Sequence, residues 1–172
     1  MISSGKDWIS LASSAESFRF VKLCDNFSFV ESSASNNAFD DFRGDGKKNV
    51  YFPVIKEDLT LEIYSIDVSK DEPQSEFVST VQLLDMKTKQ MTSKMTCYGS
   101  ELSSKGMLWL AIFDRNVILG FDLVSKTVLH QFDCIPCPND LAISSTDEDV
   151  IYVAGGKGLQ SKSHVYRRSK TN

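Results

Sequence analysis

The sequence predicts an all-β protein built of successive antiparallel sheets. Short segments rich in β-branched and aromatic residues recur along it, each bounded by polar residues or glycine. Helical spacing of apolar residues is weak throughout, and the best stretch, around residues 8–18, is poor. The order of strands and turns also repeats at an interval typical of four-stranded sheets. Together these observations predict antiparallel four-stranded blades like those of a β-propeller.

Size and composition are those of an ordinary globular protein. The chain has 172 residues, of which 41% are hydrophobic and 24% charged, enough for a domain with a real core. A net charge of −4 and a pI near 5.2 disfavour nucleic acid as a partner. No apolar run reaches the roughly 18 residues of a membrane span, and the N-terminus lacks a signal-peptide pattern. We therefore expect a cytoplasmic protein that does not bind membranes.

The N-terminal third is predicted to hold the end of one blade and the start of another. Residues 1–26 contain two segments, WISLA and FRFVKL, that fit outer strands of a preceding blade. Residues 27–30 are predicted to be an inner strand. Residues 31–48 are polar and rich in turn-forming types, which predicts a long loop. The Arg43-Gly44-Asp45 triplet in this loop is interpreted as a turn and not as an adhesion motif.

The middle of the chain is predicted to complete the first unit. Strands are expected at 49–55, 59–68 and 77–84, with a turn at 70–73 and a polar connector at 86–94. Both faces of the 59–68 segment carry apolar residues, as in a sheet that lies between two neighbouring sheets.

The second unit is the most regular part of the sequence. Its strands, and those that open a third unit, are predicted at 95–102, 107–113, 117–123, 127–133, 138–144 and 149–156. The pattern fades after Gly158. Residues 159–172 are predicted to be a polar, basic tail, with an unfinished blade containing one weak strand as the alternative.

Matched positions define the repeat. Ile66-Asp67-Val68 corresponds to Phe121-Asp122-Leu123, and Tyr51, Trp109 and Tyr152 occupy equivalent places. The interval from Trp109 to Tyr152 falls within the roughly 40–50 residues of a four-stranded propeller repeat. We predict a single propeller-like domain over residues 1–158, with blade units at about 27–84, 95–134 and 139–158, followed by the tail.

The predicted blades are too few to close a ring. Propellers close with about four to eight blades, whereas this sequence supplies about three to three and a half. We therefore expect an incomplete propeller, either truncated or completed by self-association through its open blade faces. A closed barrel or a β-sandwich is the structural alternative.

Four cysteines occupy positions 24, 97, 134 and 137, and the last two form a CxxC motif. A zinc site would need a second cysteine pair or two suitably spaced histidines, but Cys97, His130 and His164 are isolated in the sequence. The simpler interpretation of Cys134 and Cys137 is two small residues at the end of a strand.

Residues 137–156, CPNDLAISSTDEDVIYVAGG, combine Pro-Asn-Asp, an apolar strand, an acidic hairpin and a second strand. This segment resembles a recurrent part of the six-bladed propellers of the gluconolactonase, senescence-marker and strictosidine-synthase-like group. The matching residues are Pro138, Asn139, Asp140, Leu141, Ala142, Ile143, Ile151, Tyr152 and Val153.

The resemblance implies calcium at the mouth of a central channel. It makes Asn139 a ligand through its side-chain oxygen and Asp140 a second candidate, since calcium prefers oxygen donors. The bound ion would polarise a lactone or ester carbonyl. Glu16 and Glu31 do not match the context of the family's early glutamate, and the later aspartate has no counterpart here. Whether the chain is an enzyme therefore stays open.

The alternative function is a non-catalytic propeller scaffold of WD-repeat or kelch type that binds a protein partner. No Trp-Asp dipeptide closes a blade, and the double glycine Gly155-Gly156 occurs once without a kelch rhythm. Since one fold hosts many functions, the architecture leaves both alternatives open.

Overall fold

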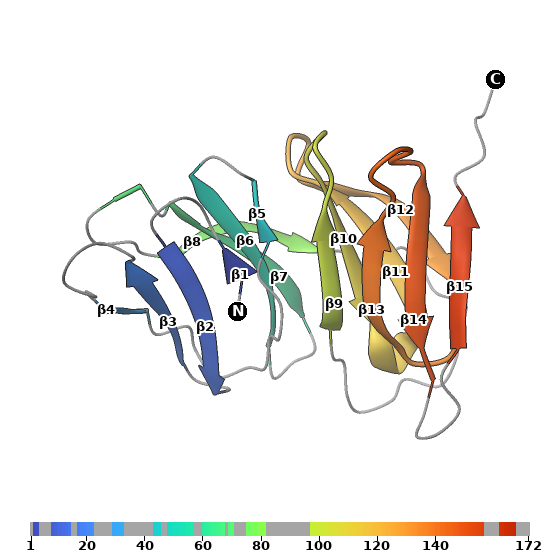
Figure 1. Ribbon diagram of the computed structural model, residues 1–172, viewed down its shortest axis with the longest axis horizontal. Coiled ribbons are helices and arrows are strands. Elements are labelled where there is room, and N and C mark those ends of the chain that lie inside the picture. The colour runs from blue at the N-terminus through green and yellow to red at the C-terminus, as the bar shows by residue number, and fades with distance from the viewer. Residues whose placement is uncertain are drawn as a thin grey trace. The chain divides into compact units, whose positions relative to one another are not determined.

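The computed structural model describes the backbone of residues 2–3, 8–14, 17–22, 29–32, 43–45, 48–56, 60–67, 69–70, 75–81, 97–156 and 162–167. This part of the chain is all-β, as predicted. Its strands form four antiparallel sheets, and the single helical element among the described residues is the 3₁₀ turn η1 (Phe113–Arg115) (Figure 1). Within the same residues, no helix is long and apolar enough to cross a membrane.

The chain, which we expected to form one domain over 1–158, divides into two compact units, Met1–Val81 and Gln82–Asn172. In every sheet the strands follow chain order, so that each strand pairs with the one before it. Such up-and-down sheets are the organisation expected of blades.

The first unit contains two four-stranded sheets. The first sheet consists of β1 (Ile2–Ser3), β2 (Trp8–Ser14), β3 (Ser17–Lys22) and β4 (Phe29–Ser32), and the second of β5 (Arg43–Gly44), β6 (Asn49–Ile55), β7 (Leu61–Asp67) and β8 (Ser75–Val81). The predicted unit 27–84 is therefore wrong at its start. The strand expected at 27–30 lies at 29–32 and pairs with β3 as the last strand of the preceding sheet.

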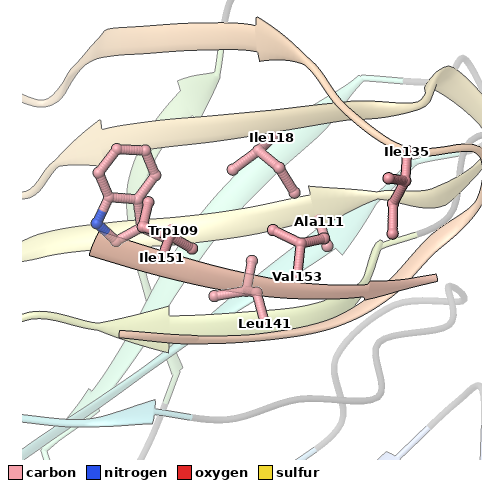
Figure 2. Close-up of a cluster of buried hydrophobic side chains, with 7 residues drawn as sticks. All are labelled: Trp109, Ala111, Ile118, Ile135, Leu141, Ile151 and Val153. Carbon is pink, nitrogen blue, oxygen red and sulfur yellow. The ribbon is translucent and has the colours of Figure 1, made fainter. Parts of the chain in front are cut away.

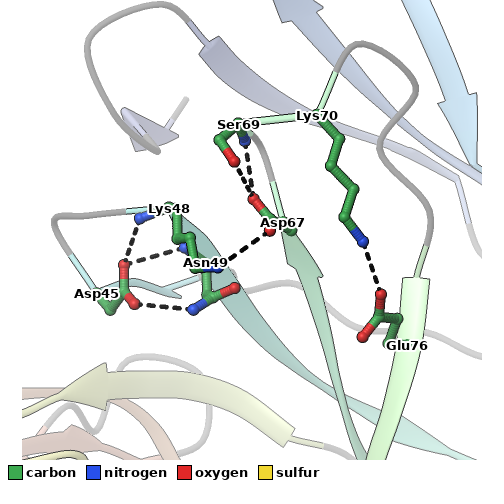
Figure 3. Close-up of polar contacts among 7 residues, drawn as sticks. All are labelled: Asp45, Lys48, Asn49, Asp67, Ser69, Lys70 and Glu76. Carbon is green, nitrogen blue, oxygen red and sulfur yellow. Dashed lines mark hydrogen bonds and ion pairs between the residues drawn. The ribbon is translucent and has the colours of Figure 1, made fainter.

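The predicted loop 31–48 is also wrong where it contains β5. Arg43 and Gly44 pair with Tyr51 and Val50. Asp45 then forms the turn, because its Oδ1 accepts the backbone N–H groups of Lys48 and Asn49, both at 3.0 Å, and its Oδ2 accepts Asn49 Nδ2 at 3.2 Å (Figure 3). This turn agrees with the structural interpretation of the Arg-Gly-Asp triplet. Residues 33–42 lie outside the described part.

The matched aspartates of the repeat occupy equivalent positions. Asp67 ends β7, and its Oδ1 accepts Ser69 N at 3.0 Å and Ser69 Oγ at 2.5 Å (Figure 3). Asp122 ends β11 (Val117–Asp122), and its Oδ2 accepts Ser125 N at 2.8 Å. In both cases the serine hydrogen bonds hold the pKa of the carboxyl below its ordinary value. Each aspartate thus stabilises the turn from the third to the fourth strand of its sheet.

The second unit contains a four-stranded and a three-stranded sheet. The first consists of β9 (Cys97–Leu102), β10 (Met107–Ile112), β11 and β12 (Thr127–Asp133), and the second of β13 (Pro138–Ile143), β14 (Val150–Gly155) and β15 (Lys162–Arg167). The predicted strands between 95 and 156 are confirmed within two residues at each end. The predicted tail 159–172 contains β15, which pairs with β14 along its whole length. The alternative of an unfinished blade was therefore the better prediction.

The aromatic residues of the repeat match as predicted. Tyr51, Trp109 and Tyr152 are each the third residue of the second strand of their sheet, in β6, β10 and β14. The matched position is buried at Trp109 and exposed at Tyr152. The repeat thus fixes the backbone position of these side chains, while the neighbouring sheet decides their burial.

The two sheets of the second unit pack against each other through a continuous apolar cluster (Figure 2). Trp109, Ala111 and Ile118 belong to the first sheet, and Leu141, Ile151 and Val153 to the second, with Ile135 from the connection between them. The first strands, β9 and β13, approach closely at Gly99, where a Cβ atom would lie 2.8 Å from the Cα of Asp140. Adjacent blades of a propeller pack in the same way.

Candidate functional site

Two polar contacts join the sheets of the second unit at opposite ends. At one end, Ser104 in the β9–β10 turn donates its backbone N–H at 3.1 Å, and also its hydroxyl, to Oε1 of Glu148 in the β13–β14 hairpin. Lys105 Nζ lies 3.6 Å from Glu148 Oε2. The Ser104 hydrogen bonds, with Lys105 nearby, hold the pKa of Glu148 below its ordinary value, so this carboxylate stays ionised at neutral pH.

At the other end, Asn116 links the β10–β11 turn to the connection that leads into β13. Its backbone is left-handed, with φ of 56°, a conformation that asparagine tolerates better than most residues. Its Oδ1 accepts Cys137 N at 2.7 Å, and its carbonyl accepts Cys134 N at 2.8 Å. Asn116 therefore fixes the path of the chain between the two sheets.

A cavity of about 410 Å³ lies between the two sheets of this unit. It is lined by residues of both sheets, of the β9–β10 turn and of the β13–β14 hairpin: Ser103, Lys105, Met107, Trp109, His130, Phe132, Asp133, Glu148, Asp149, Ile151 and Tyr166. Its volume falls within the roughly 300–1,000 Å³ typical of small-molecule sites.

Aromatic rings form much of the wall of the cavity. His130 stacks on Trp109, with ring centroids 5.5 Å apart and an interplanar angle of 14°. Phe132 lies 5.1 Å from Tyr166 and 6.3 Å from Trp109, measured between ring centroids. The Tyr166 hydroxyl accepts the backbone N–H of Ile135 at 3.0 Å, which holds its ring in place. These rings suit the apolar or planar body of an organic ligand.

The lining also carries charge. Lys105, Glu148 and Asp149 come from the two turns, and Asp133 ends β12. Glu148 Oε2 is buried and forms an ion pair with Lys105 Nζ at 3.6 Å. The cavity therefore combines aromatic walls with charged groups of both signs.

Asn139 and Asp140, the metal ligands implied by the family resemblance, do not line this cavity. Both are exposed residues of β13, next to an irregularity between Pro138 and Asp140 in the pairing with β14. Asp140 Oδ1 accepts the backbone N–H of Leu141 at 2.8 Å. No group of three or more His, Cys, Asp or Glu residues suited to a metal occurs in the described part of the chain. Glu16 and Glu31 lie outside the residues whose side chains are described.

The CxxC motif lies in the connection that Asn116 fixes. Cys134 and Cys137 are free thiols, and Cys134 Sγ donates to the carbonyl of Ile135 at 3.4 Å. Burial, with a smaller contribution from Asp133, raises the pKa of Cys134 to about 12. A redox-active cysteine needs a lowered pKa, so the environment of Cys134 supports the structural interpretation.

We expect Cys134 to react with iodoacetamide at pH 8 at least about tenfold more slowly in the native protein than in urea, because the thiolate is the reactive form. Peptide mapping by mass spectrometry measures this rate for each cysteine. Equal rates in the native and denatured protein would contradict the raised pKa and the burial that causes it.

No protein-family model matches the chain, and no curated protein is significantly similar to it in sequence.

Proposed function

We propose that the chain is a ligand-binding protein of propeller-like architecture that holds a small organic molecule between the sheets β9–β12 and β13–β15. The observation that carries the proposal is the 410 Å³ cavity with aromatic walls and charged groups from two turns. Concave, mostly apolar sites with a few placed polar groups are typical of small-molecule binding.

Two titratable groups of the cavity, Glu148 and Tyr166, have pKa shifts that suit binding better than acid–base catalysis. A carboxylate that acts as a general base near neutral pH has a raised pKa. The pKa of Glu148 is shifted downwards instead, and that of Tyr166 is raised by burial, away from neutrality. Both groups therefore keep one charge state across the physiological range, which suits a fixed binding site.

The test is calorimetric titration of the full chain with tryptophol, a neutral indole alcohol small enough for the cavity. We expect saturable binding, which Met107→Trp weakens at least about tenfold by filling the cavity. The control is Leu129→Trp on β12, a residue that is 52% exposed and does not line the cavity. Equal affinities of the native protein and Met107→Trp would contradict the proposal.

Calcium binding at Asn139 and Asp140 is a second candidate function. It is supported by one observation: both residues are exposed and adjacent on the first strand of their sheet, and amide and carboxylate oxygens are the donors that calcium prefers. Further ligands would come from elsewhere. Calorimetric calcium titration tests this candidate. Binding that Asn139→Ala removes supports it, and equal titrations of both proteins contradict it.

We also propose a cytoplasmic location. It is supported by Cys97, Cys134 and Cys137, which are free thiols, since reducing compartments keep cysteines in this state.

A further inference from the structure

In the described part of the chain, the sheet β13–β15 has three strands, whereas each of the other sheets has four. In the matched sheet, the third strand β11 pairs with β10 on one side and with β12 on the other. β15 is also a third strand, but among the described strands it pairs only with β14, and Figure 1 shows it at the outer edge of its sheet. Its other edge therefore presents backbone N–H and C=O groups to which a further strand can bind.

An exposed row of residues crosses this sheet and ends at the same edge. Ala142, Tyr152 and Val165 are successive cross-strand partners on β13, β14 and β15. All three are exposed, Tyr152 by 47% and Val165 by 63%. A residue of a fourth strand opposite Val165 would extend this row. Aromatic and β-branched residues form favourable cross-strand pairs, so this position favours an apolar side chain.

The segment around β15 is basic, although the whole chain has a net charge of −4. Residues 157–172 contain Lys157, Lys162, Arg167, Arg168 and Lys170 and no Asp or Glu. Lys162 and Arg167 are the first and last residues of β15. Opposite charges on paired strands are stabilising and like charges are destabilising. The positions of a fourth strand opposite Lys162 and Arg167 therefore favour Asp or Glu.

The same charges disfavour a second copy of this chain at the edge of β15. Antiparallel pairing of two β15 strands over their full length would place Lys162 of each copy opposite Arg167 of the other. Such like-charge pairs are destabilising. An acidic strand from another protein meets no such repulsion.

We infer that β15 binds an extended, acidic segment of another protein as the fourth strand of its sheet. The strands of this sheet pair antiparallel, and an antiparallel partner meets Arg167, Val165 and Lys162 in that order. The recognised pattern is therefore an acidic residue, one residue of any type, an apolar residue, two residues of any type and a second acidic residue. Backbone hydrogen bonds supply the affinity, and these three side chains supply the specificity.

Three fluorescently labelled peptides, titrated with the full chain at pH 7 and low salt, test the inference by fluorescence anisotropy. The peptide TETFTTET has the recognised pattern, TKTFTTKT replaces its acidic residues with lysine, and TETFPPET carries two consecutive prolines. We expect TETFTTET to bind about tenfold or more tightly than TKTFTTKT. Nonspecific attraction to a chain of net charge −4 would favour the lysine peptide instead. Consecutive residues of a strand direct their N–H groups to opposite edges, so the two prolines remove a donor whichever edge faces β15 and should abolish binding.

Three results would overturn the inference. The first is equal or tighter binding of the lysine peptide, and the second is unchanged binding of the proline peptide. The third is failure of TETFTTET to bind, which would mean that the charges of β15 serve only to keep other strands away from the edge.

Variants identify the edge responsible. Val165→Glu should weaken the binding of TETFTTET about tenfold or more, because it removes the apolar partner and adds a like charge to the edge. Val124→Glu is the same substitution at an 83% exposed residue of the β11–β12 turn and should have no effect. If both variants lower the affinity equally, net charge explains the binding and the inference is wrong. Thermal unfolding of each variant confirms that it is folded.

The inference is independent of the proposed function, because Val165 does not line the cavity. Val165→Glu should therefore bind tryptophol as the native protein does, and Met107→Trp should still bind TETFTTET. Failure of the native protein to bind TETFTTET overturns only this inference, and failure to bind tryptophol overturns only the proposed function.

Discussion

Replacing Trp109 with alanine is expected to lower the free energy of unfolding by about 3–5 kcal/mol, the range for large aromatic residues removed from a core. Trp109 is 6% exposed, belongs to the cluster that joins the two sheets of the second unit, and stacks on His130. Its loss removes buried area and leaves a space that the β-sheets cannot collapse to fill. Urea denaturation of the full chain, followed by circular dichroism, measures the change.

The repeat itself supplies the control for this prediction. Tyr152 occupies the equivalent position in the next sheet but is 47% exposed. Tyr152→Ala should therefore cost about 1 kcal/mol or less, as is usual for surface substitutions. Similar losses for the two variants would show that Trp109 is not part of a core between two sheets.

Replacing Gly99 with valine is expected to destabilise the second unit by about 3 kcal/mol, at the upper end of the cost of overpacking. A Cβ atom at Gly99 would lie 2.8 Å from Asp140 Cα and 3.2 Å from Leu141 N. These are backbone atoms, so no side chain can move aside to make room. The strands β9 and β13 would have to separate, and we expect ligand affinity to fall with stability.

Gly106 provides the contrast with this steric effect. Its φ is +84°, and nothing lies within 4 Å of a Cβ built there. Gly106→Ala should therefore cost about 1 kcal/mol, from the left-handed backbone alone. Two-state urea denaturation compares both variants. A smaller loss for Gly99→Val than for Gly106→Ala would contradict the close approach of β9 and β13.

The positions of strands could be predicted from the sequence where the local pattern is strong. The sheet to which each strand belongs was harder to predict. The segments at 107–113 and 117–123 carry dense apolar runs between polar turns, and they match β10 and β11. The segment at 27–30 also suggested a strand, but its composition does not tell which neighbour it pairs with. β5 has two residues and therefore no periodicity, and its presence depends on pairing with β6. β15 is polar in sequence and gains its order from the backbone of β14.

The cavity was hard to predict because its residues are distant in sequence. The repeat singled out Trp109, whereas His130 looked like an isolated histidine and Glu148 one residue of a polar hairpin. Packing of two sheets brings these side chains together. Met107 and Trp109 lie on one face of their strand, and His130 and Phe132 lie on one face of theirs. This spacing is the signal that could have indicated that the two strands line the same cavity. Calcium at Asn139 and Asp140 and a protein partner stay predictions.

The face-to-face packing of the sheets β9–β12 and β13–β15 is the basis of the cavity and of the proposed function, and NMR tests it directly. In a labelled sample of the full chain, we expect strong nuclear Overhauser effects from the Gly99 Hα protons to Asp140 Hα and to the Leu141 amide, because these backbones nearly touch. If these effects are absent while those within each sheet are present, the two sheets do not pack in this way, and the cavity between them does not exist.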